Sequence, residues 1–264
     1  MRIPGLPAPM SCQGGRKSQV GRHDEWVEGR PSTMASRENI LRPIHKGIRS
    51  MIYSLGLELG ITDFTNVSKS NAIAFLLKHD INMASSNCLL CLLYAHSKEE
   101  ETGIFSAVRS LDEGVFGKMM REHRVITRQV QTLASICDEL MVTSDPGRRV
   151  ELGERLNAEA SELFAAYLEH MNHEEAEMIP LMWNHFTDQQ LRELRFQYYA
   201  QIPQARFEEW MRWMISALNP TELKQLLSSL RDDPPPNRYS DAIRIAKERV
   251  SVDRRATIGT DGPS

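Results

Sequence analysis

Several marks of common protein classes are missing from this chain of 264 residues. No apolar run approaches the ~18 residues that a membrane-spanning helix needs, and residues 1–22 lack the apolar stretch of a secretory signal. Four cysteines are too few for a disulfide framework at this length, so a reducing cytoplasm is expected. A net charge of -3 gives no reason to expect a nucleic acid or an anionic membrane as partner.

Signals for β-strands are missing as well. There is no sustained alternation of apolar and polar residues, and no hairpin turn between β-branched runs. Apolar residues recur at helical spacing over about 36–57, 83–111 and 116–140, and again over 156–181 after the turn SDPGRR. Four amphipathic helices joined by short or moderate loops predict an all-α fold, an antiparallel four-helix bundle.

The two ends of the chain differ from this helical region. Residues 1–35 are rich in Gly, Pro, Arg and Ser and predict a disordered tail, in which Met34 is an alternative start. The bundle is expected over residues 36–186, followed by a C-terminal helical hairpin over 187–231. Residues 232–264 are expected to form a proline-containing linker, a short helix and a tail.

The expected hairpin contains an aromatic and sulfur-rich patch within residues 205–217. Trp210, Met211, Trp213 and Met214 lie close together in the string FEEWMRWMI. Packing of the hairpin on the bundle explains these residues, and a surface for a protein partner is the second interpretation.

Each of the four predicted helices carries a histidine on its apolar face: His45, His96, His123 and His170. The second and fourth helices add a glutamate four residues later, Glu100 and Glu174. A spacing of four places both side chains one turn apart on the same helical face. Burying a carboxylate there is costly unless something pairs with it, which favours metal ligands.

Two segments repeat the same pattern. HSKEEETGIF and HMNHEEAEMI both read His, three residues, Glu-Glu, two residues and two apolar residues. The doubled acid is expected about 0.1 times per chain by chance. The pattern is therefore a weak internal duplication of a helix pair, each pair giving His and then His-x-x-x-Glu. A single buried histidine is more often a hydrogen-bonded core residue, but the joint pattern favours metal.

This pattern resembles the hemerythrin-like (HHE cation-binding) family, whose members hold a non-haem di-iron centre inside a four-helix bundle. The resemblance covers residues 36–186. It implies two iron ions bridged by an oxo group and by carboxylates. In that interpretation the terminal nitrogen ligands are His45, His96, His123 and His170. The bridging carboxylates are Glu100 and Glu174. Imidazole and carboxylate both suit iron.

The sequence departs from the oxygen carriers of this family at one position. In those carriers the third helix has a second histidine, four residues after its first one. Here the first is His123, and the position four residues later is Thr127. Four histidines with two glutamates instead resemble members linked to nitric-oxide stress and iron–sulfur repair. The expected function is thus to bind or sense O₂, NO or peroxide, or to hold iron. The first alternative is a di-iron enzyme or iron-donating repair protein. The second alternative is a metal-free helical interaction module.

Other residues carry weaker signals. His79 and His173 are possible extra ligands, although neither lies cleanly on an apolar face. Glu101 and Glu175 lie about 100° round their helices from Glu100 and Glu174, so they are expected to be solvated or to support the ligands. Cys88-x-x-Cys91 resembles half of a zinc site but is expected to be core.

Several enzyme classes lack their motifs. No histidine has a glutamate three residues before it, which excludes the ferritin-like carboxylate pattern. The zinc-protease, phosphate-loop and nucleophile-elbow motifs are also absent.

Overall fold

The computed structural model describes residues 37–78, 88–232 and 236–249, and every regular element within these ranges is a helix. The all-α fold expected from the sequence is confirmed. No helix in the described ranges combines the length and the apolar character needed to cross a membrane. The predicted N-terminal tail, Met34 and His79 all lie outside the described residues.

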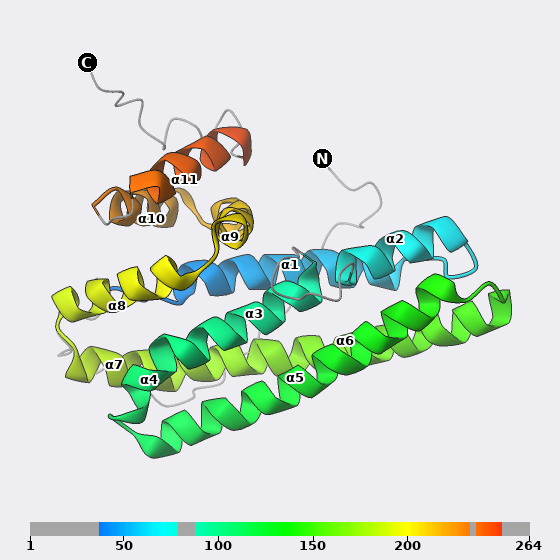
Figure 1. Cartoon of the computed structure of the whole chain (residues 1–264), viewed down its shortest axis with the longest axis horizontal. Coiled ribbons are helices and arrows are strands. Elements are labelled where there is room, and N and C mark those ends of the chain that lie inside the picture. Colours follow the sequence, from blue (N-terminus) through cyan, green and yellow to red (C-terminus); the bar gives the residue numbers. More distant parts are fainter. Residues whose placement is uncertain (1–36, 79–87, 233–235, 250–264) are drawn as a thin grey trace, which may run out of the picture. The chain divides into compact units, whose positions relative to one another are not determined.

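Four helices and the π turn that follows the fourth carry the six predicted ligands; the four helices lie alongside one another (Figure 1), and their contacts close a ring. They are α1 (Arg42–Gly60), α3 (Leu89–Thr102), α5 (Glu113–Val142) and α6 (Pro146–His173). In the ring, α1 contacts α3, α3 contacts α5, α5 contacts α6, and α6 contacts α1. Residues 143–145 join α5 to α6, so these two long helices run in opposite directions.

Local capping signals fix where the helices begin. The side chains of Asp112 and Asp145 accept hydrogen bonds from the backbone N–H groups of Val115 and Arg148, which start α5 and α6. Thr187 forms a capping box at the start of α8 (Asp188–Gln201). These caps satisfy donors that the first helical turn leaves without partners, so short sequence signals define the helix starts.

The structure contains a helix that the sequence analysis did not predict, α2 (Val67–Leu77). Its signal was present in the sequence, because the Asn66 side chain caps it by accepting from the N–H of Lys69. Ile73, Ala74 and Leu77 are buried, and α2 contacts α1 and α5.

The single helix predicted over 83–111 is wrong in its extent. Residues 79–87 lie outside the described part, and the rest is split into α3 and a short α4 (Ile104–Arg109). The split falls at Gly103. A Cβ atom built there would lie 2.7 Å from Nε2 of Gln201 and 3.2 Å from Cδ2 of Tyr198. Glycine therefore lets α8 approach α3 closely.

The fourth ligand helix changes its hydrogen-bond pattern at Glu174. The π-helical turn η2 (Glu174–Met178) separates α6 from α7 (Ile179–His185). Pro180 lies just beyond it and has no N–H to donate to the carbonyl four residues before. The wider turn accommodates this loss, and such π turns are frequent at functional sites.

The C-terminal part has more helices than the expected hairpin. Residues 187–231 contain α8, α9 (Gln204–Ala217) and most of α10 (Pro220–Asp232), and α11 (Pro236–Arg249) follows. The α9 helix packs on α1, where Gly47 lies so close that a Cβ would be 3.1 Å from the backbone nitrogen of Met214. Trp210, Met211 and Met214 of the sulfur-rich patch are buried, as packing of this region predicts.

Two further features lie in the core. Cys88 and Cys91 are buried, as expected of core residues, and they form a disulfide at the start of α3 that the sequence analysis did not predict. The Arg149 guanidinium is fully buried and, among the described residues, donates to neutral acceptors. These are the carbonyls of Phe64, Leu140 and Thr143, the Asn71 side-chain oxygen and the Ser70 hydroxyl.

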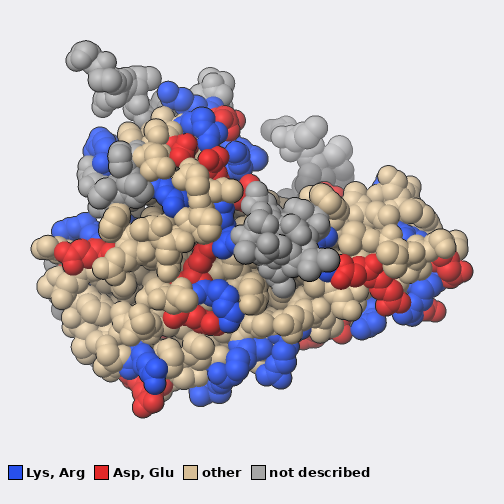
Figure 2. All heavy atoms as spheres, viewed as in Figure 1, with Lys and Arg blue, Asp and Glu red and all other residues tan. Residues whose placement is uncertain are grey.

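Basic and acidic side chains occur next to each other over the face of the molecule shown in Figure 2. The exposed ion pairs of the described residues include Arg148–Glu139 and Arg244–Glu208.

Candidate metal centre

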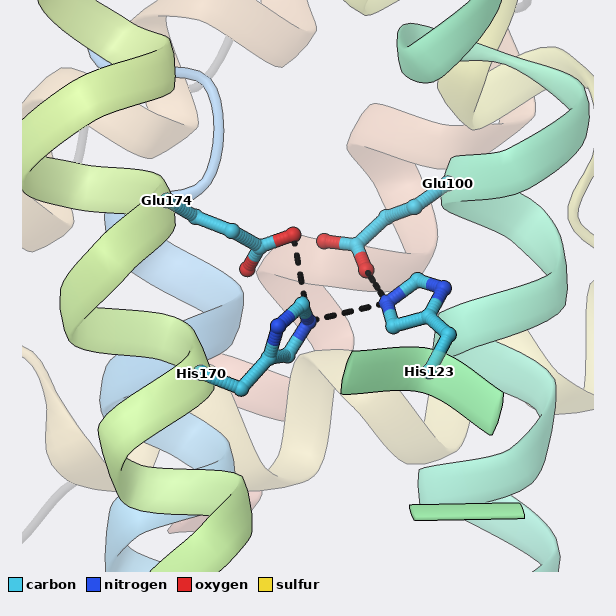
Figure 3. Close-up of side chains that lie close together, drawn as sticks. All are labelled: Glu100, His123, His170 and Glu174. Atoms are coloured by element: carbon cyan, nitrogen blue, oxygen red, sulfur yellow. Dashed lines mark hydrogen bonds and ion pairs between the residues drawn. The ribbon is translucent and has the colours of Figure 1, made fainter. Parts of the chain in front are cut away.

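All six predicted ligands meet in one buried cluster. Their exposed fractions are 2% or less, although they come from four different helices and the π turn. Figure 3 shows four of them, with the carboxylates of Glu100 and Glu174 and the rings of His123 and His170 pointing toward one another. Two overlapping groups could each hold a metal ion: His45 with His96 and Glu100, and Glu100 with His123, His170 and Glu174.

The Glu100 carboxylate faces two different histidine pairs. Its Oε1 lies 3.1 Å from Nε2 of His96 and 3.8 Å from Nε2 of His45. Its Oε2 lies 3.4 Å from Nε2 of His123. One oxygen thus belongs with His45 and His96, and the other with the second group.

Glu174 divides its two oxygens in the same way. Its Oε2 lies 3.2 Å from Nε2 of His45, and its Oε1 lies 3.3 Å from Nε2 of His170. The cluster therefore has two halves, the His45/His96 half and the His123/His170 half. Both carboxylates face both halves.

The Nδ1 atom of every one of these histidines is held by a group outside the cluster. Three of the groups are carboxylates and one is a phenol. The Nδ1 contacts are His45 to Glu175 at 2.8 Å, His96 to Tyr198 at 3.1 Å, His123 to Glu101 at 3.2 Å and His170 to Glu122 at 2.8 Å. A hydrogen on Nδ1 leaves the lone pair of a neutral ring on Nε2, so the outer contacts direct Nε2 toward the centre.

Most of the inward-facing atoms are buried without a hydrogen-bond partner among the described residues. They are Nε2 of His45 and of His96 and both carboxylate oxygens of Glu100 and of Glu174. Buried polar groups normally find partners, and leaving a charged one without any is expensive. A cation between the two carboxylates would satisfy these atoms together.

The pKa values of the cluster also indicate that positive charge stabilises the two buried carboxylates. Burial alone would lower the pKa of His170, but attraction to Glu174 and the contact with Glu122 raise it to about 10. Burial and repulsion from Glu174 would raise the pKa of Glu100, yet the facing histidines lower it to about 2. Histidines in the protein without metal thus take up protons to balance two buried carboxylates.

One histidine behaves differently from the others. Burial lowers the pKa of His96 to about 4, because attraction to Glu100 does not outweigh the loss of solvent and the repulsion from His45. Its outer partner is the neutral hydroxyl of Tyr198, whereas the other three rings contact glutamates.

The donor set fits a pair of cations of intermediate hardness. Neutral imidazole and carboxylate together suit iron and other first-row transition metals, and no thiolate contributes to the cluster. Aromatic rings enclose it: Phe105 stacks on His123, Tyr167 lies edge-on to His170, and Trp210 lies edge-on to His96.

The possible extra ligand His173 does not join the cluster. Its Nδ1 lies 2.9 Å from the other oxygen of Glu122, and its side chain is 30% exposed. Glu101 and Glu175, expected to be solvated or supporting, hold the Nδ1 atoms of His123 and His45. Both therefore take the supporting position.

Two of the outer groups were not identified from the sequence. Glu122 lies immediately before His123 in the sequence, but its carboxylate contacts His170 on another helix. The sequence gives no sign of that contact. Tyr198 is 102 residues from His96, and no local spacing connects the two. Both positions depend on how the helices pack.

Comparison with protein-family models, with curated proteins and with solved structures finds no match to this chain. The fold and the cluster define an all-α protein with buried His and Glu residues that could hold metal.

Proposed function

We propose that this chain is a non-haem di-iron protein of the hemerythrin-like kind. In this proposal α1, α3, α5 and α6 form an antiparallel four-helix bundle that holds two iron ions. Its function is to bind or sense a small oxidant or diatomic ligand, O₂, NO or peroxide, or to hold iron.

The observation that carries the proposal is the division of both buried carboxylates between two histidine pairs. Glu100 and Glu174 each direct one oxygen to the His45/His96 half and the other to the His123/His170 half. A single ion would need only one of these halves. Two ions would use every inward-facing atom, and the two negative charges would offset their mutual repulsion.

Each residue then has a distinct task. The four histidines would be terminal ligands through Nε2, and the two glutamates would bridge. Iron held by such ligands supplies redox chemistry and a coordination position for a small ligand. The rings of Phe105, Tyr167 and Trp210 contact these histidines, and the burial of the cluster strengthens the charge interactions inside it.

Metal analysis of the protein produced with iron tests the proposal directly. We expect about two irons per chain and a visible absorption spectrum that disappears when a chelator removes the metal. One zinc per chain, or no metal at all, would contradict the assignment.

Substitution of a bridging residue adds a sharper test. Glu174→Ala should lose both irons, because the remaining ligands leave two cations with one shared carboxylate. His45→Ala should weaken mainly one position. Glu177→Ala is the matched control, since Glu177 belongs to the same π turn but pairs with Lys118 instead. Unchanged iron content in Glu174→Ala would show that the cluster is not the metal site.

A further inference from the structure

The outer contacts of the cluster follow the internal repeat of the chain. Each helix pair contributes a histidine and then His-x-x-x-Glu-Glu, and the second glutamate reaches across to the other pair. Glu101 of the first pair holds His123 of the second, and Glu175 of the second pair holds His45 of the first. These two contacts join equivalent positions of the two repeats.

The two pairs differ at the residue that precedes the first histidine of each pair. In the second pair Glu122, the residue before His123, holds His170 and also contacts His173. The equivalent residue of the first pair, immediately before His45, is Ile44, which is fully buried and has no polar atom in its side chain. The first pair therefore offers no carboxylate at this position to hold His96.

The C-terminal helices fill this gap. Tyr198 of α8 places its hydroxyl 3.1 Å from Nδ1 of His96. Glu99 stands where the second pair has His173, and Arg206 of α9 pairs with it at 2.8 Å. Gly103 eases the approach of α8, because a Cβ there would lie 3.2 Å from Cδ2 of Tyr198, closer than an ordinary contact.

We propose that the C-terminal helices α8 and α9 complete one of the two metal positions, and that Tyr198 is a positioning residue for His96. The inference rests on the proposed two-metal function. It predicts that the two halves bind metal with different affinities. In the His123/His170 half both rings are held by carboxylates, whereas in the His45/His96 half one ring is held by a neutral phenol.

This difference sets the order of metal binding. A carboxylate at Nδ1 increases the basicity of the ring and orients it, and removal of such an outer partner typically reduces metal affinity 10–100-fold. A neutral hydroxyl orients the ring but adds less negative charge. The His123/His170 half therefore fills first, and the His45/His96 half loses its metal first.

The test is a titration of the metal-free, full-length protein with Co²⁺, followed by visible absorption and by calorimetry. The wild-type protein should bind two ions in two steps of different affinity. Tyr198→Phe should weaken only the weaker step, by about 10–100-fold. Glu122→Gln should weaken the stronger step, so that the two affinities approach each other.

Tyr199→Phe is the matched control, because Tyr199 is the neighbouring buried tyrosine and its ring packs on Tyr198 and Phe207. It should leave both steps unchanged. Circular dichroism melting of each variant checks that the fold persists.

The possible outcomes separate the two proposals. If Tyr198→Phe weakens both steps equally, or neither, the role of the C-terminal helices is wrong while the two-metal function stands. Equal affinity of both steps in the wild type would also overturn the inference. If the wild-type protein binds no Co²⁺ and no iron, the proposed function itself fails.

Discussion

The Nε2 atoms of His123 and His170 lie 2.8 Å apart in the interior, closer than either lies to a carboxylate oxygen. Two ring nitrogens at this distance need a hydrogen between them, with one ring donating and the other accepting. A cation bound by both rings would have to replace that hydrogen.

We therefore expect metal to remove one hydrogen-bond signal and to leave others. Nitrogen-15 NMR of the imidazole groups should show an Nε2–H for this pair in the metal-free protein. Saturation with Zn²⁺, which is diamagnetic, should abolish it. The Nδ1–H signals of His123 and His170 should persist, because Glu101 and Glu122 still accept from them. An Nε2–H that survives saturation would contradict this.

Removal of metal should destabilise the fold. In the metal-free protein only the facing histidines offset the two buried carboxylates, whereas a ligand at about 100 times its Kd adds about 2.7 kcal/mol to stability. We expect a chelator to lower the Tm, and hydrogen exchange to rise most over residues 92–104 and 166–178, which carry both a His and a Glu. Glu174→Ala is the control, since a chelator should not change its Tm.

The effect of the chelator should depend on pH. The raised pKa of His170, about 10 in the metal-free protein, means that its charged form stabilises the fold fully below its ordinary pKa of about 6.5. That stabilisation disappears as the pH rises toward 10. Metal also binds more tightly as protons leave the ring. The loss of Tm on chelation should therefore be larger near pH 9 than near pH 6.5, and an equal loss would contradict it.

Arg149 offers a test of the fold away from the cluster. Its buried guanidinium has five neutral acceptors, which a lysine ammonium cannot reach in the same planar arrangement. Arg149→Lys should lower the free energy of unfolding by about 2–4 kcal/mol, because several buried acceptors lose their donors. The adjacent Arg148 is exposed, and Arg148→Lys should change stability little. Urea denaturation of both variants makes the comparison, and equal midpoints would show that the buried contacts contribute little.

The cysteines of the described residues should differ in reactivity. Burial raises the pKa of the Cys137 thiol to about 12, so almost no thiolate exists near pH 8, and Cys88 and Cys91 are joined. Alkylation of the native protein should label none of the three. Unfolding without a reductant should expose Cys137 alone, and reduction should add the other two. Peptide mass spectrometry reads each position, and labelling of Cys88 before reduction would contradict the disulfide.

The sequence by itself determined the helical class and the six inward-facing residues. Helical periodicity is a local property, so apolar spacing placed His45, His96, His123 and His170 on the buried faces, and a spacing of four placed the glutamates beside two of them. The paired pattern of His and Glu-Glu also revealed the repeat. It did not reveal α2, because that helix has little apolar periodicity and is marked mainly by the Asn66 cap.

Only the tertiary structure decided which group holds each ring. Glu101 and Glu175 reach histidines of the opposite pair, and Tyr198 reaches His96 across 102 residues. Such contacts depend on the distance and rotation between packed helices, which many distant residues set together. The close approach of Gln201 and Tyr198 to Gly103 likewise depends on how α8 packs on α3.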